Sequence, residues 1–183
     1  MERWFPIETK RLLLREFTAT DEADIHEYAS DPLVPQYDCW GPNTREQTHE
    51  RLSKGLIKQQ DWPRDDVTLA VELLEAGKLI GSVRLWVVDD ANGTAELGYS
   101  FNRSYWNRGF ATEAARALLD PAFRIMKMHR VCATCDTRNV GSWRVMEKLG
   151  MRREAHFVRD KLQRGEWRDT FLYAVLQDEW RLT

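Results

Sequence analysis

The sequence is poor in cysteine and has no long apolar segment. Three cysteines among 183 residues are too few, and an odd number, for a disulfide framework. No apolar run approaches the roughly 20 residues of a membrane-spanning helix, and the first residues lack the apolar core of a signal peptide. With 10 glycines and 6 prolines the chain is neither fibrous nor of low complexity. We therefore expect a cytoplasmic protein that contacts no membrane.

Neither sign of charge dominates the chain. The 27 Lys and Arg residues oppose 29 Asp and Glu residues, for a formal net charge of -2, which argues against a protein that coats nucleic acid. The balance is uneven, because residues 1–120 carry 14 basic and 21 acidic side chains and residues 121–183 carry 13 and 8. This asymmetry suits a cationic substrate and an anionic cofactor, although ordinary scatter of surface charge would also produce it. We predict no nucleic-acid partner.

Hydrophobic periodicity predicts strands and helices along the whole chain. Strands are expected over residues 9–17, 67–74, 78–88, 95–101 and 129–135, and on both sides of a turn at Arg164-Gly165. Helices are expected over residues 22–30, 45–60, 111–123 and 140–149. The order predicts one α/β domain over residues 1–183, with a core of about 8–180. Its sheet should be mixed, largely antiparallel and twisted, with about seven strands and about four flanking helices. Trp167 is expected in the core.

A strand, a glycine-containing loop and a helix start follow one another around Gly109. A helix N-terminus presents main-chain N–H groups without intrahelical acceptors, and these suit a phosphate. Arg108 adds charge and Thr112 adds a hydroxyl. The loop is neither a Walker A loop nor the three-glycine dinucleotide motif. By itself the pattern also occurs at helices that simply begin with a glycine.

Two motifs in this region resemble those of the GNAT superfamily of N-acetyltransferases. That superfamily has a strand, then Q/R-x-x-G-x-G/A, then a helix, and later N-x-x-[AS]-x-x-x-x-x-K-x-G. Residues 95–101 match the strand, and the loop reads Trp106-Asn107-Arg108-Gly109-Phe110-Ala111. The second motif is matched by Asn139, Ser142, Lys148 and Gly150. Residues 9–15, 111–114 and 165–169 are most similar to the ribosomal-protein-alanine acetyltransferases.

The resemblance implies an acetyl-CoA cleft, with acetyl-CoA as co-substrate and no metal, where the strands near 95–101 and 129–135 splay apart. Main-chain groups of Tyr99, Ser100 and Phe101 would align the pantetheine arm. The loop and the helix start would hold the pyrophosphate through the amides of Trp106, Asn107, Arg108, Gly109, Phe110, Ala111 and Thr112. Asn139 would hydrogen-bond the pantetheine arm or structure the cleft. Because Trp106 stands where the superfamily more often has Gln or Arg, one phosphate contact would depend on the main chain alone.

The same resemblance suggests Glu96 and Ser142 as catalytic residues. Direct transfer needs a neutral amine, and Glu96 lies where several relatives keep a general-base glutamate; otherwise it is a charge at a strand edge. The tyrosine that commonly protonates the CoA thiolate corresponds to Met146, which cannot donate a proton. In the resembling branch a serine serves instead, at the position of Ser142, as an acid or thiol-binding group. Ser142 would equally suit a structural place at a helix N-terminus, and Glu113 is expected to support a helix start.

The acceptor would bind at the loop over residues 31–44 and the final hairpin. Tyr37 and Trp40 would wall a slot, with Asp38 attracting a cationic amine, unless the two rings are local packing. We expect an acetyltransferase for protein or peptide N-terminal amines. A small-molecule acetyltransferase for a polyamine, amino acid or antibiotic is the alternative, and a non-catalytic acyl-CoA-binding module is the second.

Two further expectations concern assembly and metals. Exposed edge strands and the C-terminal hairpin would permit a homodimer. Cys132 and Cys135 lie three residues apart on an expected strand, so they should point to opposite faces. Since the chain has no second cysteine pair to complete a zinc site, we predict no metal site.

Overall fold

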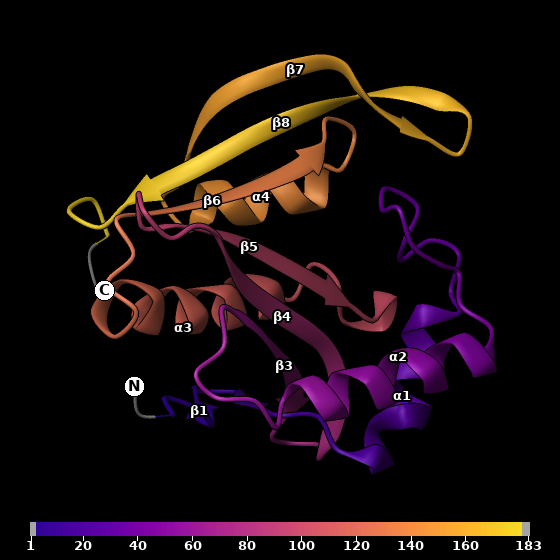
Figure 1. Cartoon of the computed structure of the whole chain (residues 1–183). Helices are drawn as coiled ribbons and strands as arrows, with labels where there is room; N and C mark the ends of the chain where they lie inside the picture. The colour runs from indigo at the N-terminus through magenta and orange to yellow at the C-terminus, as the bar shows by residue number, and fades with distance from the viewer. Residues whose placement is uncertain (1–2, 181–183) are drawn as a thin grey trace.

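One sheet and four α-helices make up residues 3–180, the part of the chain that the computed structural model describes (Figure 1). The strands are β1 (Ile7–Glu8), β2 (Leu12–Arg15), β3 (Asp66–Leu73), β4 (Lys78–Asp89), β5 (Thr94–Phe101), β6 (Arg130–Asp136), β7 (Arg152–Gln163) and β8 (Glu166–Leu176). The helices are α1 (Glu22–Ala29), α2 (Arg45–Lys58), α3 (Phe110–Arg124) and α4 (Val140–Lys148). Short 3-10 turns, Ala19–Asp21 and Arg103–Tyr105, precede α1 and α3.

The strands lie in the order β1-β2-β3-β4-β5-β6-β8-β7 across the sheet. Neighbouring strands are antiparallel except β5 and β6, which run parallel because α3 crosses over between them. The parallel pair meets at only three positions, from Thr94 and Arg130 to Glu96 and Cys132. Beyond this point the strands separate, so the expected splay at the centre of the sheet is present.

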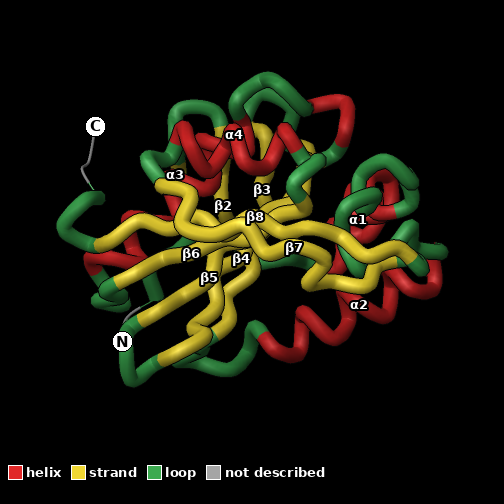
Figure 2. The backbone as a smooth tube through the Cα atoms, turned by 90° about the horizontal axis from the view of Figure 1, so that it is seen from above, coloured by secondary structure: helices red, strands yellow, loops and turns green. Residues whose placement is uncertain are grey.

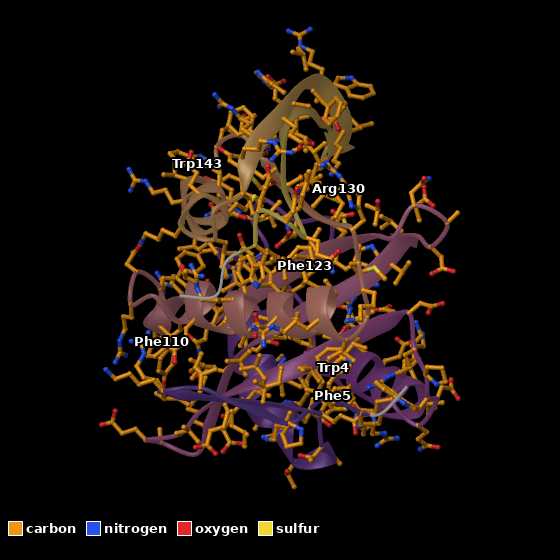
Figure 3. All side chains as sticks on the ribbon, turned by 90° about the vertical axis from the view of Figure 1, so that its left-hand side faces the viewer. Trp4, Phe5, Phe110, Phe123, Arg130 and Trp143 are labelled. Atoms are coloured by element: carbon orange, nitrogen blue, oxygen red, sulfur yellow. The ribbon has the colours of Figure 1, made fainter. Side chains whose placement is uncertain are left out.

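The two faces of the sheet are covered by different helices. Helix α3 packs on β4 and β5 and α4 packs on β6 and β8, whereas α1 packs on β4 from the other face; Figure 2 shows α4 and α2 on opposite sides of the strands. Helix α3 lies close to the sheet because it turns small and branched residues inward, namely Ala114, Ala115, Leu118 and Leu119, which are all buried. Figure 3 labels Phe110 and Phe123 near the two ends of this helix. Its packing fixes the N-terminus of α3 beside the end of β5.

The expected α/β fold is confirmed, with two differences. The sheet has eight strands rather than about seven, because a turn divides the first expected strand; the Thr9 N–H donates to the Leu12 carbonyl at 2.8 Å. Trp167 is 60% exposed, so the prediction that it lies in the core was wrong. Strand β6 ends at Asp136, which pairs with Thr170. Trp167 therefore lies beyond the end of β6, on a hairpin that extends past the covered part of the sheet.

Candidate active site

The gap between β5 and β6 exposes the main chain of one predicted residue in particular. The Asn102 N–H donates to the Ile80 carbonyl of β4 at 2.9 Å. In an antiparallel ladder the direction alternates, so Ser100 also turns its main-chain groups to β4, and Tyr99 turns its N–H and C=O to the gap. Phe101 has the same orientation as Tyr99, but its carbonyl accepts the indole N–H of Trp106 at 2.8 Å. Of the three residues expected along a pantetheine arm, Tyr99 alone directs both main-chain groups to the gap without this indole contact.

Glu96 and Tyr99 point to opposite faces of the sheet, because they lie three residues apart on one strand. Tyr99 packs against the main core cluster beneath α3 and α4. On the other face, the Thr134 hydroxyl of β6 donates to Glu96 Oε1 at 3.1 Å. Burial, and then the nearby Glu96 charge, raise the pKa of the Cys132 thiol. A molecule lying in the gap would therefore meet Tyr99 from one face and Glu96 from the other.

Three side chains from three different elements meet on the α4 side of the gap. The Tyr99 hydroxyl donates to the Ser142 carbonyl at 2.9 Å and lies 3.0 Å from Ser142 Oγ. The Ser142 hydroxyl also hydrogen-bonds the Cys135 thiol of β6, whose pKa is raised by burial to about 11. Burial likewise raises the pKa of Tyr99. Ser142 is thus held between the two separated strands.

Helix α4 begins beside the gap because Asn139 caps it. Asn139 Oδ1 accepts the Ser142 N–H at 3.1 Å, which satisfies one of the free donors at the helix start. Of the two roles expected for Asn139, this contact corresponds to structuring the cleft. Met146, at the position where the superfamily commonly has a tyrosine acid, is 1% exposed and belongs to the core.

The loop before α3 contains two residues in the left-handed conformation. Asn107 has a φ of 59°, and Gly109, the N-cap of α3, has a φ of 81°. Glycine adopts such angles without a steric penalty, and the turn leads directly into the free N–H groups of the helix. The Trp106 indole is engaged by the Phe101 carbonyl, so this side chain braces the loop. The donors that the loop and helix start can offer an anion are therefore main-chain amides, accompanied by the charge of Arg108.

A brace from the first strands holds this loop, and sequence reasoning missed half of it. The Glu113 carboxylate accepts the Thr9 hydroxyl at 2.8 Å, the Arg11 N–H at 3.0 Å and Arg11 Nε at 2.7 Å. Arg11 Nη1 donates to the Arg108 carbonyl at 3.0 Å, and its guanidinium lies 4.3 Å from the centre of the Phe110 ring. Glu113 supports the helix start as expected, but it does so through a residue 102 positions earlier. No local spacing signals such a pair.

The loop over residues 31–44 is fastened to the tip of the β7–β8 hairpin. Arg164 Nη2 donates to the carbonyls of Pro35 and Gly41 at 3.1 Å and of Trp40 at 3.4 Å. The Gln163 side chain donates to the Asp38 carbonyl. Two segments far apart in the sequence thus form one wall.

The three residues expected to bind an acceptor have different surroundings. Tyr37 lies against the guanidinium of Arg138, 5.8 Å from its ring centre, just beyond the end of β6. Trp40 packs against the second core cluster, with Tyr28 and Ala29 of α1, as the local-packing interpretation expects. Burial raises the pKa of the Asp38 carboxyl, and the charge of Arg164 opposes that shift. Asp38 is therefore compensated by the hairpin and does not form an isolated negative site.

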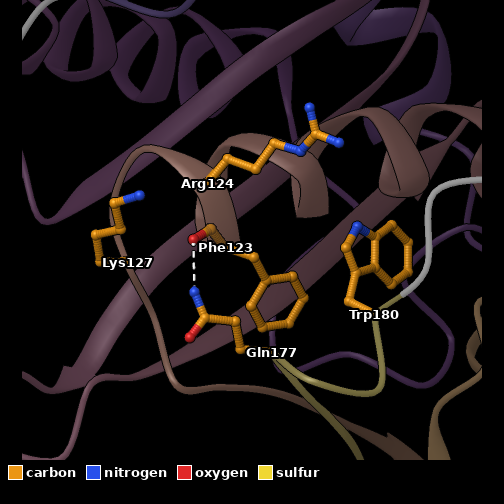
Figure 4. A pocket seen from close by; sticks show the side chains of 5 residues that line it. All are labelled: Phe123, Arg124, Lys127, Gln177 and Trp180. Atoms are coloured by element: carbon orange, nitrogen blue, oxygen red, sulfur yellow. Dashed lines mark hydrogen bonds between the residues drawn. The ribbon is translucent and has the colours of Figure 1, made fainter.

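Two surface hollows do not include the gap residues Glu96, Tyr99 and Ser142. One, of 260 Å³, lies at the C-terminal end of α3, where the Gln177 side chain donates to the Phe123 carbonyl at 3.1 Å (Figure 4). The other, of 490 Å³, is lined mainly by side chains of α4, β7 and β8. Within residues 3–180 no group of three or more His, Cys, Asp or Glu residues could hold a metal ion. No helix in the same range is long and apolar enough to cross a membrane.

Comparison with known proteins gives consistent matches over nearly the whole chain. A family model described as an acetyltransferase (GNAT) domain matches residues 11–152. The uncharacterized N-acetyltransferase YnaD of Bacillus subtilis is 38% identical over 174 residues, which is 95% of this chain and 98% of that protein. The crystal structure of a GNAT-family acetyltransferase from Bacillus anthracis has a TM-score of 0.84 and 38% identity, covering 94% of this chain and 99% of that one.

Two more distant structures share the fold and carry different acceptors in their names. The ribosomal-protein-S5-alanine acetyltransferase from Vibrio fischeri has a TM-score of 0.79 and 22% identity, covering 96% of this chain and 98% of that one. The spermidine N-acetyltransferase from Vibrio cholerae, solved with CoA and spermine, has a TM-score of 0.78 and 21% identity, covering 94% and 99%. At these identities the likeness concerns the fold, which serves more than one class of acceptor.

Proposed function

The chain belongs to the GNAT family of acetyltransferases, and from this premise we propose that it moves the acetyl group of acetyl-CoA directly to the free N-terminal amine of a protein or peptide. The observation that carries the proposal is the gap between β5 and β6, with Ser142 beside it on one face and Glu96 on the other. Two substrates can approach one point from opposite faces, and direct transfer requires that their reacting atoms meet there.

The residues around the gap suit acetyl-CoA as the acetyl donor. The free amides and the positive dipole end of the 15-residue α3 suit a pyrophosphate, and Arg108 adds charge beside them. The main-chain N–H and C=O of Tyr99 suit the amides of a pantetheine arm lying along β5 as another strand would. The same N–H is placed to polarise a thioester carbonyl, the kind of fixed donor that contributes strongly to acyl transfer.

Glu96 is the residue that we assign as general base. An ammonium group must lose a proton before its nitrogen can attack, and Glu96 takes that proton, directly or through one water. The nitrogen lone pair forms the C–N bond, the C–S bond breaks, and its electron pair stays on sulfur. Ser142 stabilises the thiolate by a hydrogen bond. Because a serine hydroxyl is a weaker acid than a thiol, the sulfur takes its proton from water.

The acceptor side supports a peptide in preference to a small polyamine. A polyamine would call for an enclosed acidic pocket, whereas the Asp38 carboxyl is opposed by Arg164. Neither hollow found within residues 3–180 is lined by Glu96 or Ser142. A peptide N-terminus can lie across an open face without an enclosing pocket. The homodimer suggested by the exposed edge strands stays a prediction.

Release of free thiol from acetyl-CoA tests the proposal. The acceptors are peptides that begin with Ser or Ala, the same peptides with blocked N-termini, and a set of polyamines and aminoglycosides. We expect turnover with free peptides and none with blocked ones. Turnover with small amines alone would transfer the assignment to metabolite or drug acetylation. Acetyl-CoA binding without turnover on any acceptor would favour a non-catalytic binding module.

A variant of the base separates catalysis from binding. Glu96→Gln keeps the size of the side chain and an acceptor for the Thr134 hydroxyl but removes the basic carboxylate. We expect turnover to fall by about 100-fold or more, with the affinity for acetyl-CoA unchanged in calorimetry. Unchanged turnover would remove Glu96 from the reaction.

A further inference from the structure

Tyr99 bridges the gap from β5 to α4 with a polar group that packing does not require. Leu97 and Phe101, on the same face of β5, fill their places in the core with purely apolar side chains. Burying a phenol hydroxyl is unfavourable unless it finds hydrogen-bond partners. Here it finds two on one residue, the Ser142 carbonyl at 2.9 Å and Oγ at 3.0 Å. The hydroxyl therefore bears on the conformation of Ser142.

The number of protons restricts how this group can be arranged. The Tyr99 phenol and the Ser142 hydroxyl each carry one proton. When the phenol donates to the Ser142 carbonyl, the serine proton can turn to the phenol oxygen or to the Cys135 thiol, its neighbour on β6. When the phenol donates to Oγ, the serine proton is left to point elsewhere. The two acceptors differ by only 0.1 Å in distance, so a small rotation of the phenol O–H exchanges the arrangements.

We propose that Tyr99 is a positioning residue that aims the Ser142 hydroxyl at the sulfur atom of the coenzyme. This inference rests on the proposed function. As the C–S bond breaks and its electron pair stays on sulfur, Ser142 donates a hydrogen bond to the thiolate, and Tyr99 donates to Ser142 Oγ. Both hydroxyls keep their protons, and the thiolate is protonated by water. Burial raises the pKa of Tyr99, which keeps the phenol protonated and able to donate at neutral pH.

A double-mutant cycle tests whether Tyr99 acts through Ser142. The variants are Tyr99→Phe, Ser142→Ala and the two combined, assayed for the single-turnover rate of thiol release with the acceptor peptide that the wild type uses best. Loss of one supporting hydrogen bond should slow Tyr99→Phe by about 3- to 10-fold. With Ser142 already replaced by alanine, Tyr99→Phe should cause no further loss. Acetyl-CoA affinity, measured by calorimetry, should be the same in all four proteins.

Tyr28→Phe is the matched control. Tyr28 is also a buried tyrosine, and its hydroxyl bonds the side chain of Ser82 in the second core cluster, away from the gap. We expect this variant to lose stability on the same scale as Tyr99→Phe, as measured by urea unfolding, while its single-turnover rate stays at the wild-type value. Any kinetic effect that merely follows a weakened fold would appear in both variants.

Several outcomes would overturn the inference. These are an unchanged rate in Tyr99→Phe, an equal loss with and without Ser142, a loss shared by Tyr28→Phe, or a fall in acetyl-CoA affinity that accounts for the slower rate. Each of them requires an active wild type and leaves the proposed acetyl transfer intact. A wild type that binds acetyl-CoA yet acetylates no amine would instead defeat the proposed function, and this inference with it.

Discussion

The two regions that flank the gap are built in different ways. The coenzyme region, comprising β5, the loop before α3, α3 and α4, depends on helix starts and on the main chain of one strand. Its turn residues, Asn107 and Gly109, and its cap, Asn139, act within a few positions of themselves in the sequence. The acceptor region, comprising residues 31–44 and the β7–β8 hairpin, depends on a side chain that reaches across the fold, since Arg164 and Pro35 are 129 residues apart.

This difference separates what is general from what is specific in the molecule. Main-chain donors persist when side chains change, so a coenzyme site made from them tolerates sequence variation. Contacts made by single side chains are lost with one substitution, so an acceptor wall that depends on Arg164 can be altered without disturbing the coenzyme site. Such a division explains how one fold accommodates both ribosomal-protein and polyamine enzymes among its structural neighbours. Substitutions in each region should therefore have separable effects.

The largest expected effect comes from changing the backbone of the coenzyme region. Gly109→Ala places a Cβ on a residue with a φ of 81°, a conformation that costs an L-residue roughly 1–2 kcal/mol. The turn should relax and redirect the first amides of α3, so we expect acetyl-CoA affinity to fall by about 10-fold or more in calorimetry.

Gly165→Ala supplies the control for this change. Gly165 has the same φ of 81°, and a Cβ there would meet no atom within 4 Å, but it lies at the hairpin turn of the acceptor region. It should lose comparable stability and keep its acetyl-CoA affinity. Equal loss of affinity in the two variants would mean that the cradle senses general destabilisation and not its own turn.

A smaller effect is expected from the brace beneath the cradle. Arg11→Met keeps the length of the side chain but removes its contacts with the Glu113 carboxylate at 2.7 Å and the Arg108 carbonyl at 3.0 Å. We expect acetyl-CoA binding to weaken by about 3- to 10-fold. Arg84→Met is matched, because Arg84 pairs with Asp66 at 2.7 Å and is similarly exposed, 45% against 40% for Arg11. If both variants weaken binding equally, the effect arises from net charge and not from the brace.

The acceptor region should respond in the opposite sense. Arg164→Ala removes the donor shared by the carbonyls of Pro35, Trp40 and Gly41 and should free this segment from the hairpin. We expect the KM for the acceptor peptide to rise by about 3-fold, while acetyl-CoA affinity stays at its wild-type value. Steady-state kinetics with each substrate varied in turn provides the measurement. Weaker acetyl-CoA binding in Arg164→Ala would show that the two regions are coupled, contrary to the comparison.

The sequence foretold the coenzyme region better than the acceptor region for a physical reason. Gly109 and Asn139 carry out their structural work at adjacent helix starts, so composition and spacing identify them. The bridge from Tyr99 to Ser142 spans 43 residues and depends on where α4 packs, which no local pattern encodes. In the loop over residues 31–44, aromatic content alone could not distinguish a binding wall from packing, and Trp40 packs against α1.

The smallest effect is expected where sequence reasoning on the core was wrong. Trp167 lies beyond the end of β6 and is 60% exposed, whereas Tyr173, six positions further along β8, pairs with Ala133 of β6 and is 2% exposed. Trp167→Ser should therefore change the free energy of unfolding by less than about 0.5 kcal/mol, and Tyr173→Ser should cost about 3 kcal/mol or more. Urea unfolding at several protein concentrations measures both. If Trp167→Ser proved as costly as Tyr173→Ser, and its cost grew with protein concentration, the hairpin tip would be covered in solution by a second copy of the chain, and the acceptor region would be shared between subunits.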